Sequence, residues 1–224
     1  MKFIIVFFCL MGGTLFAQTT RPYTTTQPKP KMTDEQKLEK FGIAQSDKNM
    51  LGGLKVGEHA PNFSGLDQNG NTVELNELLK EGEVVVIFYR GYWCGICNRH
   101  LSNLEEQLSS ITDKGATVIA VTSESNEYAK KTSEKNDLSF SVISDTDNTI
   151  LSDYKVLYEV SESYQQKIVG FTNNSIKDYN DSDEAILPIP ATYIIDQQGN
   201  ISWKDYNINY SKRASVEDIS QALK

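Results

Sequence analysis

The sequence has no excess of positive charge. Its 224 residues contain 22 Lys and Arg against 30 Asp and Glu, a formal net charge of −8. Proteins that bind nucleic acid replace phosphate counterions with a stripe of Lys and Arg. Because the chain offers only the short cluster Arg21, Lys29 and Lys31 in a Thr- and Pro-containing segment, we expect no nucleic-acid partner.

Cysteine is scarce as well. The chain has three, Cys9, Cys94 and Cys97, and the last two stand three positions apart. A purely structural bridge between them would add little stability, because chain-entropy arithmetic gives so short a loop only about 2 kcal/mol. A redox-active pair is therefore favoured over an inert staple.

The sequence also lacks an uninterrupted run of about 20 apolar residues, the length that spans a bilayer. Its apolar stretch at 3–10 follows Lys2 and precedes Leu15-Phe16-Ala17, the pattern of a signal peptide over 1–17. Cleavage would remove Cys9, and the bulky residues before Cys9 disfavour a lipid anchor there. We therefore expect an exported protein, periplasmic or extracellular, with no stable membrane insertion after cleavage.

Composition divides the remaining chain into a linker and one domain. Residues 18–53 predict a flexible linker, because their Thr- and Pro-containing start has too little apolar content to fold. A short helix is expected within it, since Thr33 and Gln36 have the spacing of a capping box. Residues 54–224 are enough for one hydrophobic core.

Within that domain, apolar runs alternate with helical spacing. Val84–Tyr89 is apolar on both faces, which is typical of a central strand covered by helices. Leu101, Leu104, Leu108 and Ile111 predict one amphipathic helix from Cys97 to about Lys114.

The other predicted elements surround this strand and helix. They are a hairpin over 63–75, strands at 117–121, 140–143, 191–196 and 201–203, and helices at 126–136 and from 215. The order β-α-β-α-β implies parallel crossovers, hence an α/β fold. Residues 155–187 predict a partly helical insertion.

The segment Trp93-Cys94-Gly95-Ile96-Cys97 stands where the central strand gives way to the helix. A thiolate at the start of a helix faces unpaired N–H groups and the positive end of the helix dipole. Lowering a cysteine pKa from about 8.5 to about 7 raises its thiolate fraction at neutral pH from roughly 3% to roughly half. The pattern predicts a nucleophilic cysteine with a second cysteine that resolves mixed disulfides.

Several segments resemble the peroxiredoxin-like branch of the alkyl hydroperoxide reductase and thiol-specific antioxidant (redoxin) family. They are residues 56–63, 88–94, 144–145, 190–196 and 199–201. The resemblance covers about 54–224 and implies a thioredoxin fold. Its expected features are a central mixed sheet flanked by helices, an N-terminal hairpin, and an insertion before a strand that begins at a cis proline.

The resemblance is incomplete at the expected site. Register from Phe88 places the family's peroxidatic cysteine at Cys97 and its threonine at Cys94. The family's proline falls on Arg90 and its catalytic arginine on Pro190. These departures favour thioredoxin-like chemistry, in which Cys94 attacks a disulfide and Cys97 releases the product.

A thioredoxin-like site implies further roles. Pro190, in a cis bond after Ile189, would hold the substrate backbone beside the reactive sulfur, next to Trp93, and Pro188 is a competing candidate for this role. Arg90 either raises the local positive potential or is a solvated charge. The buried acid of thioredoxins is missing, because its position is Phe88. Candidate surrogates are Glu58, Asp145, Glu159 and Glu162. Tyr210 and Arg213 resemble a late family pattern to which we assign no chemistry.

Three functions stay open from the sequence. The first is thiol–disulfide exchange; the second is a thiol-dependent peroxide reductase with Cys97 peroxidatic and Cys94 resolving; the third is a redox-inactive binding module. The expected partners are a protein or small-molecule disulfide or thiol, or a peroxide, and a dithiol electron donor.

A zinc site is the remaining alternative for the two cysteines. Cys94, Cys97, His100 and His59 would supply four ligands. It is disfavoured, because the predicted helix would direct His100 away from both sulfurs. We therefore expect no metal and no cofactor.

Overall fold

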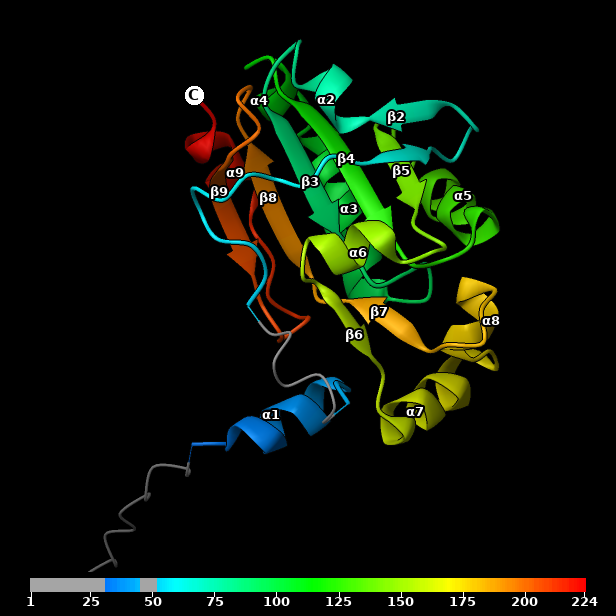
Figure 1. The fold of residues 1–224 in the computed structure, drawn as a ribbon. Helices are drawn as coiled ribbons and strands as arrows, with labels where there is room; N and C mark the ends of the chain where they lie inside the picture. The colour runs from blue at the N-terminus through cyan, green and yellow to red at the C-terminus, as the bar shows by residue number, and fades with distance from the viewer. Residues whose placement is uncertain (1–30, 45–51) are drawn as a thin grey trace, which may run out of the picture. The chain divides into compact units, whose positions relative to one another are not determined.

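The computed structural model describes residues 31–44 and 52–224 (Figure 1). The predicted signal peptide over 1–17 lies outside the described residues, as does most of the predicted linker. One compact unit runs from Met32 to Lys224. It includes α1 (Asp34–Phe41), so the folded part begins before the predicted boundary at Leu54.

The predicted α/β architecture is confirmed by a five-stranded mixed sheet. β3 (Val84–Phe88) lies at its centre, because it is the strand that is apolar on both faces and all five of its side chains are at most 1% exposed. The strand order is β5 (Ser141–Ser144), β4 (Thr117–Thr122), β3, β8 (Ala191–Ile195), β9 (Ile201–Tyr206). β3, β4 and β5 are parallel, as the crossover argument predicts, and β8 runs antiparallel to β3 and β9.

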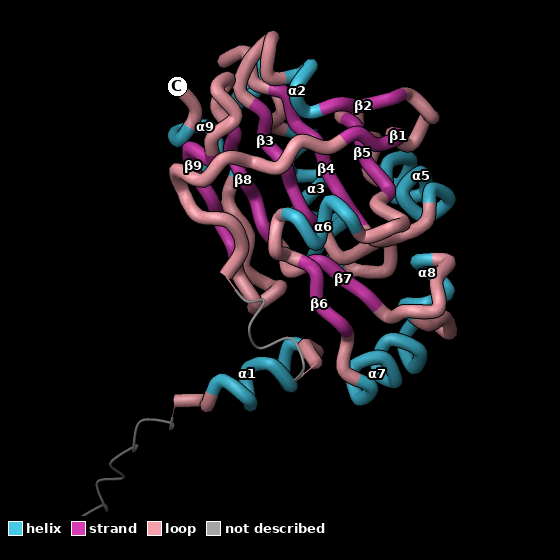
Figure 2. Tube along the Cα trace, viewed as in Figure 1, coloured by secondary structure: helices cyan, strands magenta, loops and turns pink. Residues whose placement is uncertain are grey.

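Helices cover both faces of this sheet (Figures 1 and 2). Val85 and Ile87 point to one face and pack with Leu101 of α3 (Gly95–Glu106) and Ile219 of α9 (Val216–Ala222). That core also takes in residues of α4 (Ser109–Thr112) and α5 (Asn126–Lys135). The opposite face of β3 packs under α2 (Leu75–Leu78) and α6 (Thr149–Asp153).

The predicted hairpin near the start of the domain is present. β1 (Ser64–Leu66) pairs antiparallel with β2 (Thr72–Glu74) around the turn that Asp67 caps through its side chain. The short helix α1 is also present, with the capping box of Thr33 and Gln36 that the sequence predicts. Local side-chain chemistry accounts for both elements.

The insertion is more ordered than predicted. It begins with β6 (Leu157–Glu159), continues through α7 (Glu162–Thr172) and α8 (Ile176–Asn180), and returns along β7 (Ile186–Pro188). β6 pairs antiparallel with β7. On its other side, β6 meets residues 42–44: the N–H of Ala44 donates to Glu159 and the N–H of Ser161 donates to Gly42.

Two predictions are wrong. The single helix from Cys97 to Lys114 is two helices, because Gln107 leaves helical geometry with φ −117° while the apolar spacing continues through the break. The predicted cis bond between Ile189 and Pro190 is absent, since every peptide bond in the described ranges is trans. The trans form is the usual state before proline, favoured by about 0.5–1 kcal/mol.

Candidate active site

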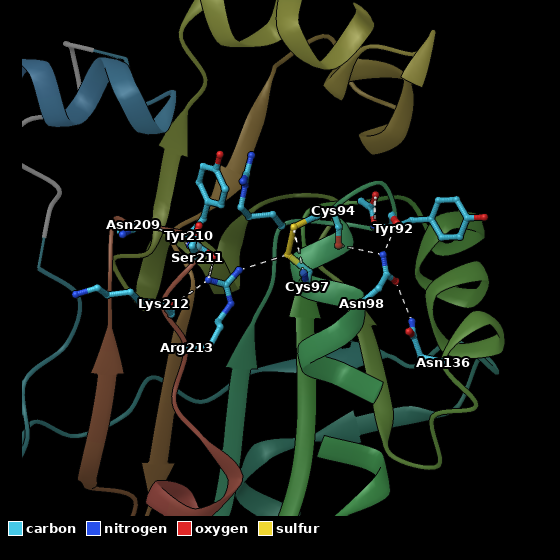
Figure 3. The surroundings of a disulfide bond; sticks show 12 residues. Tyr92, Cys94, Cys97, Asn98, Asn136, Asn209, Tyr210, Ser211, Lys212 and Arg213 are labelled. Atoms are coloured by element: carbon cyan, nitrogen blue, oxygen red, sulfur yellow. Dashed lines mark hydrogen bonds between the residues drawn. A yellow bond between two sulfur atoms is a disulfide. The ribbon is translucent and has the colours of Figure 1, made fainter. Parts of the chain in front are cut away.

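Cys94 and Cys97 form a disulfide at the N-terminus of α3, directly after the central strand (Figure 3). Cys94 is the N-cap residue, and its Sγ accepts a hydrogen bond of 3.3 Å from the N–H of Cys97. The α3 N-terminus therefore directs a backbone donor at the sulfur of Cys94. The two residues are 5% and 1% exposed, so Cys94 is the more accessible.

Asn98 fixes the backbone of this loop from inside the protein. Its Nδ2 donates to the carbonyls of Tyr92 and Cys94 at 2.7 and 3.0 Å. Its Oδ1 accepts from Nδ2 of Asn136, at the end of α5, at 2.9 Å (Figure 3). The turn that carries the dithiol is thereby tied to a neighbouring helix.

Arg90 is a buried cation, with a side chain that is 1% exposed. The guanidinium carbon lies 4.7, 5.2 and 4.1 Å from the ring centres of Trp93, Tyr164 and Tyr210. Nη2 also donates to the hydroxyl of Tyr164 at 2.8 Å. The alternative that Arg90 is a solvated charge is therefore wrong, and the residue joins the dithiol loop to α7 and to the segment after β9.

Trp93, Ile189 and Pro190 lie at the end of the sheet from which the dithiol loop departs. Trp93 is half-buried and packs against Tyr179 of α8 at 6.3 Å between ring centres. Phe88 pairs with Ala191 across the sheet, so Ile189 and Pro190 adjoin the segment that follows β3. Ile189 is held there by donating its N–H to Val156 at 2.6 Å.

Arg213 contacts the disulfide directly, a role that the sequence did not reveal. Its Nη2 lies 3.4 Å from Sγ of Cys97, 116 positions away in the chain (Figure 3). Burial and the charge of Arg90 lower the pKa of Arg213 to about 10, which leaves it cationic at neutral pH. In the sequence, Arg213 stands out only because it resembles a late family pattern, and that pattern assigns it no role.

Glu124 is the buried acid at this site, and the sequence did not single it out. It follows β4, is fully buried, and accepts the N–H of Tyr92 with both carboxyl oxygens, at 2.8 and 2.7 Å. Burial raises its pKa to about 8. A sequence signal for Glu124 does exist. It is an acidic residue just after a buried strand, and that strand neighbours the strand that leads to the dithiol.

The four acids considered as surrogates lie in other settings. Glu58 accepts the N–H of Lys55 at the surface, and Glu159 and Glu162 are exposed. The carboxylate of Asp145 accepts N–H groups at the start of α6, while its burial raises its pKa to about 6.

The two histidines do not converge on the sulfurs. His59 pairs with Asn200 in an isolated bridge, and burial followed by the charge of Arg213 lowers the pKa of His100 to about 4. In the described part of the chain, no three His, Cys, Asp or Glu side chains form a group able to hold a metal ion. No helix there is both long and apolar enough to cross a membrane.

A dithiol at the N-terminus of the helix after the central strand of this sheet defines a thiol redox protein with the thioredoxin fold. The AhpC/TSA family model matches residues 56–204, and the chain belongs to that family. This confirms the resemblance drawn from the sequence.

Two relatives with different names are similar to this chain. The thiol-disulfide oxidoreductase ResA of a Bacillus cereus strain is 32% identical over 125 residues, 52% of this chain and 71% of the relative. Peroxiredoxin Bcp of Escherichia coli is 29% identical over 108 residues, 48% of this chain and 69% of the relative. Both names denote oxidoreductases, which is the enzyme class of this chain.

Solved structures agree on the fold. The peroxidoxin BcpB of Mycobacterium tuberculosis superposes with a TM-score of 0.59 at 17% identity, covering 76% of this chain and 94% of that one. A cysteine-to-serine mutant of the peroxiredoxin 6 of Arenicola marina gives a TM-score of 0.60 at 14% identity, with 75% and 71% covered.

Proposed function

We propose that this chain carries out thiol–disulfide exchange through Cys94 and Cys97. The observation that carries the proposal is the disulfide at the N-terminus of α3, in which Cys94 is the N-cap. The name of the ResA relative, which denotes a thiol-disulfide oxidoreductase, supports it. Its substrate is a protein or small-molecule disulfide or thiol.

Cys94 is the sulfur that meets the substrate, because it is the more exposed of the two and faces the helix N-terminus. Its thiolate attacks a substrate disulfide and expels one substrate thiolate, forming a mixed disulfide. Cys97 then attacks Cys94, expels the second substrate thiolate and closes the protein disulfide. Trp93, Ile189 and Pro190 position the substrate at this end of the sheet.

A peroxide reductase is the second candidate. In it, the Cys97 thiolate attacks a peroxide oxygen, the O–O bond breaks with release of water or an alcohol, and Cys97 becomes a sulfenic acid; Cys94 then attacks that sulfur, forms the disulfide and releases water. The contact of Arg213 with Sγ of Cys97 favours it, because a cation at the attacking sulfur stabilises its thiolate. Cys94 and Pro190 replace the threonine and arginine expected to polarise the peroxide bond, so we expect this reaction to be slow.

Stopped-flow tryptophan fluorescence of the reduced protein separates these functions. The protein is mixed with a model disulfide or with hydrogen peroxide, alongside Cys94→Ser and Cys97→Ser. A faster reaction with the disulfide that Cys94→Ser abolishes supports exchange. A fast peroxide reaction lost in Cys97→Ser supports the peroxidase, and no reaction with either supports a binding module.

We further propose that the protein is exported, with a dithiol protein as its electron donor. The support is the signal-peptide pattern over 1–17, which leaves Cys94 and Cys97 as the cysteines of the mature chain. Mass spectrometry of the protein from a bacterial periplasm tests this. A mature chain that begins at Gln18 is expected, and a full-length chain retained in the cytoplasm contradicts export.

A further inference from the structure

Arg213 is anchored so that its guanidinium faces the buried sulfur. Nη1 donates to the carbonyl oxygens of Lys212, at 3.0 Å, and Tyr210. Nη2 is left to point at Sγ of Cys97, at 3.4 Å (Figure 3). The segment between β9 and α9 thus orients the cation through its own backbone.

No carboxylate of the described residues forms an ion pair with this cation. Among residues 31–44 and 52–224, neither Arg90 nor Arg213 has such a partner within 4.0 Å. Asp205 of β9 acts on Arg213 only at longer range, and Arg90 opposes it with a like charge. Within that part of the chain, an anion on Cys97 would therefore be the first negative charge in direct contact with the guanidinium.

Three further ionisable neighbours, His100, Tyr158 and Tyr164, are neutral at physiological pH. His100, one turn further along α3, has a pKa lowered to about 4 by burial and by Arg213. Tyr158 of β6 and Tyr164 of α7 have pKa values raised by burial. Tyr210 lies against Arg90. The guanidinium of Arg213 is accordingly the cation in contact with Sγ of Cys97, while Arg90 and Asp205 act on Arg213 from farther away.

We propose that Arg213 holds Cys97 as a thiolate whenever the disulfide is open. The inference rests on the proposed redox function of this dithiol, and it adds that each of the two sulfurs is stabilised by a different group. The backbone N–H at the start of α3 donates to the sulfur of Cys94, and the guanidinium of Arg213 contacts the sulfur of Cys97.

The step on which Arg213 acts is the opening or closing of the protein disulfide. When a substrate thiolate attacks Sγ of Cys94, a new sulfur–sulfur bond forms, the Cys94–Cys97 bond breaks, and its electron pair leaves on Cys97. In the reverse direction, the Cys97 thiolate attacks Cys94 of the mixed disulfide and expels the substrate thiolate. Arg213 stabilises the same anion in both directions, so it also favours the reduced protein over the disulfide.

Titration of Cys97 alone tests the proposal without turnover. The parent carries Cys9→Ser and Cys94→Ser, and its thiolate is followed by ultraviolet absorbance and by the rate of alkylation against pH. We expect a Cys97 pKa below the ordinary value of about 8.5, and a rise of about one unit or more in Arg213→Gln. Arg213→Lys keeps the charge and should restore part of the shift.

The matched control is Arg99→Gln, which removes the same charge from an exposed position on α3. It should leave the pKa of Cys97 unchanged. A parent pKa at or above about 8.5 overturns the proposal, and this measurement needs no variant of Arg213. Equal shifts in Arg99→Gln and Arg213→Gln also overturn it, because a general loss of charge would then explain them.

The redox equilibrium supplies a second readout. In the chain that retains both cysteines, equilibration with glutathione should show a disulfide about tenfold harder to reduce in Arg213→Gln than in the parent. An unchanged equilibrium contradicts the inference. If Cys97 titrates as expected but no substrate disulfide reacts, the proposed function fails while the role of Arg213 stands.

Discussion

Both carboxyl oxygens of Glu124 accept the same backbone N–H, that of Tyr92, at 2.8 and 2.7 Å. Burial raises the pKa of Glu124 to about 8 from its ordinary 4.5, so the folded protein keeps a proton that the unfolded chain releases. The free energy of unfolding should therefore fall as pH rises from about 4.5 to about 8. Two residues before Cys94, the dithiol loop is tied to a group that titrates in the working range of pH.

Replacing Glu124 by Gln removes this titration and should flatten the pH dependence. Between pH 6 and 8 the wild type should lose about 2 kcal/mol that the variant retains. Urea unfolding of the oxidised protein at several pH values measures the difference. Asp145, with a pKa near 6, contributes mainly below this window. Glu106→Gln, at an exposed acid on α3, is the control; equal slopes for wild type and Glu124→Gln would refute the argument.

Gly91 should not tolerate a side chain. Its φ is +149°, and a Cβ there would lie 2.6 Å from the carboxyl carbon of Glu124 and 2.7 Å from Nε1 of Trp93. Gly91→Ala should therefore lower the free energy of unfolding by about 1–3 kcal/mol. Gly95 is the matched control, since a Cβ there meets no atom within 4 Å. Gly95→Ala should be neutral or slightly stabilising in urea unfolding, and similar losses at both positions would contradict this account.

Asn98 should matter through its three hydrogen bonds. Asn98→Ala leaves the carbonyls of Tyr92 and Cys94 without this donor and should cost about 1–3 kcal/mol. Asn103→Ala changes the same residue type at an exposed position on α3 and should cost less than about 0.5 kcal/mol. Hydrogen exchange at Cys94 should quicken in the first variant only. Unchanged exchange there would show that the dithiol loop does not depend on Asn98.

Arg90 should not be replaceable by lysine. A lysine ammonium cannot stack on three rings and donate to Tyr164 at once, so Arg90→Lys should lose about 1–2 kcal/mol of stability. Limited proteolysis should then cut the insertion faster, because Tyr164 lies in α7. The exposed Arg99→Lys serves as control. Equal stability and equal cleavage in the two variants would count against this role for Arg90.

Local signals explain what the sequence predicted well. The apolar run at β3, the hairpin turn at Asp67, the capping box at Thr33 and the helix start at Ser215 each involve residues within a few positions of one another. The spacing of Cys94 and Cys97 is likewise a local signal, since the two residues are three positions apart. Such patterns report backbone geometry and burial directly, without knowledge of what lies across the fold.

Contacts between distant segments explain what the sequence did not reveal. β6 and β7 have three residues each and pair across α7 and α8, so no period or turn marks them. Glu124 meets Tyr92 only because parallel crossovers bring the ends of β3 and β4 together. Arg213 meets Cys97 from the other end of the domain. These relationships arise from packing, which a single sequence does not encode as a pattern.

The pairing of residues 42–44 with β6 has a consequence for association between molecules. β6 has β7 on one side, and Gly42 and Ala44 on the other, so both of its edges are covered. The portion that the family model matches begins at residue 56 and does not include this cover. In a chain shortened to that portion, the carbonyl of Glu159 and the N–H of Ser161 would lose the backbone hydrogen bonds that Ala44 and Gly42 supply, which opens a strand edge of the kind on which chains aggregate. Residues 42–44 thus cover a strand edge that would otherwise be open to pairing with another copy of this chain.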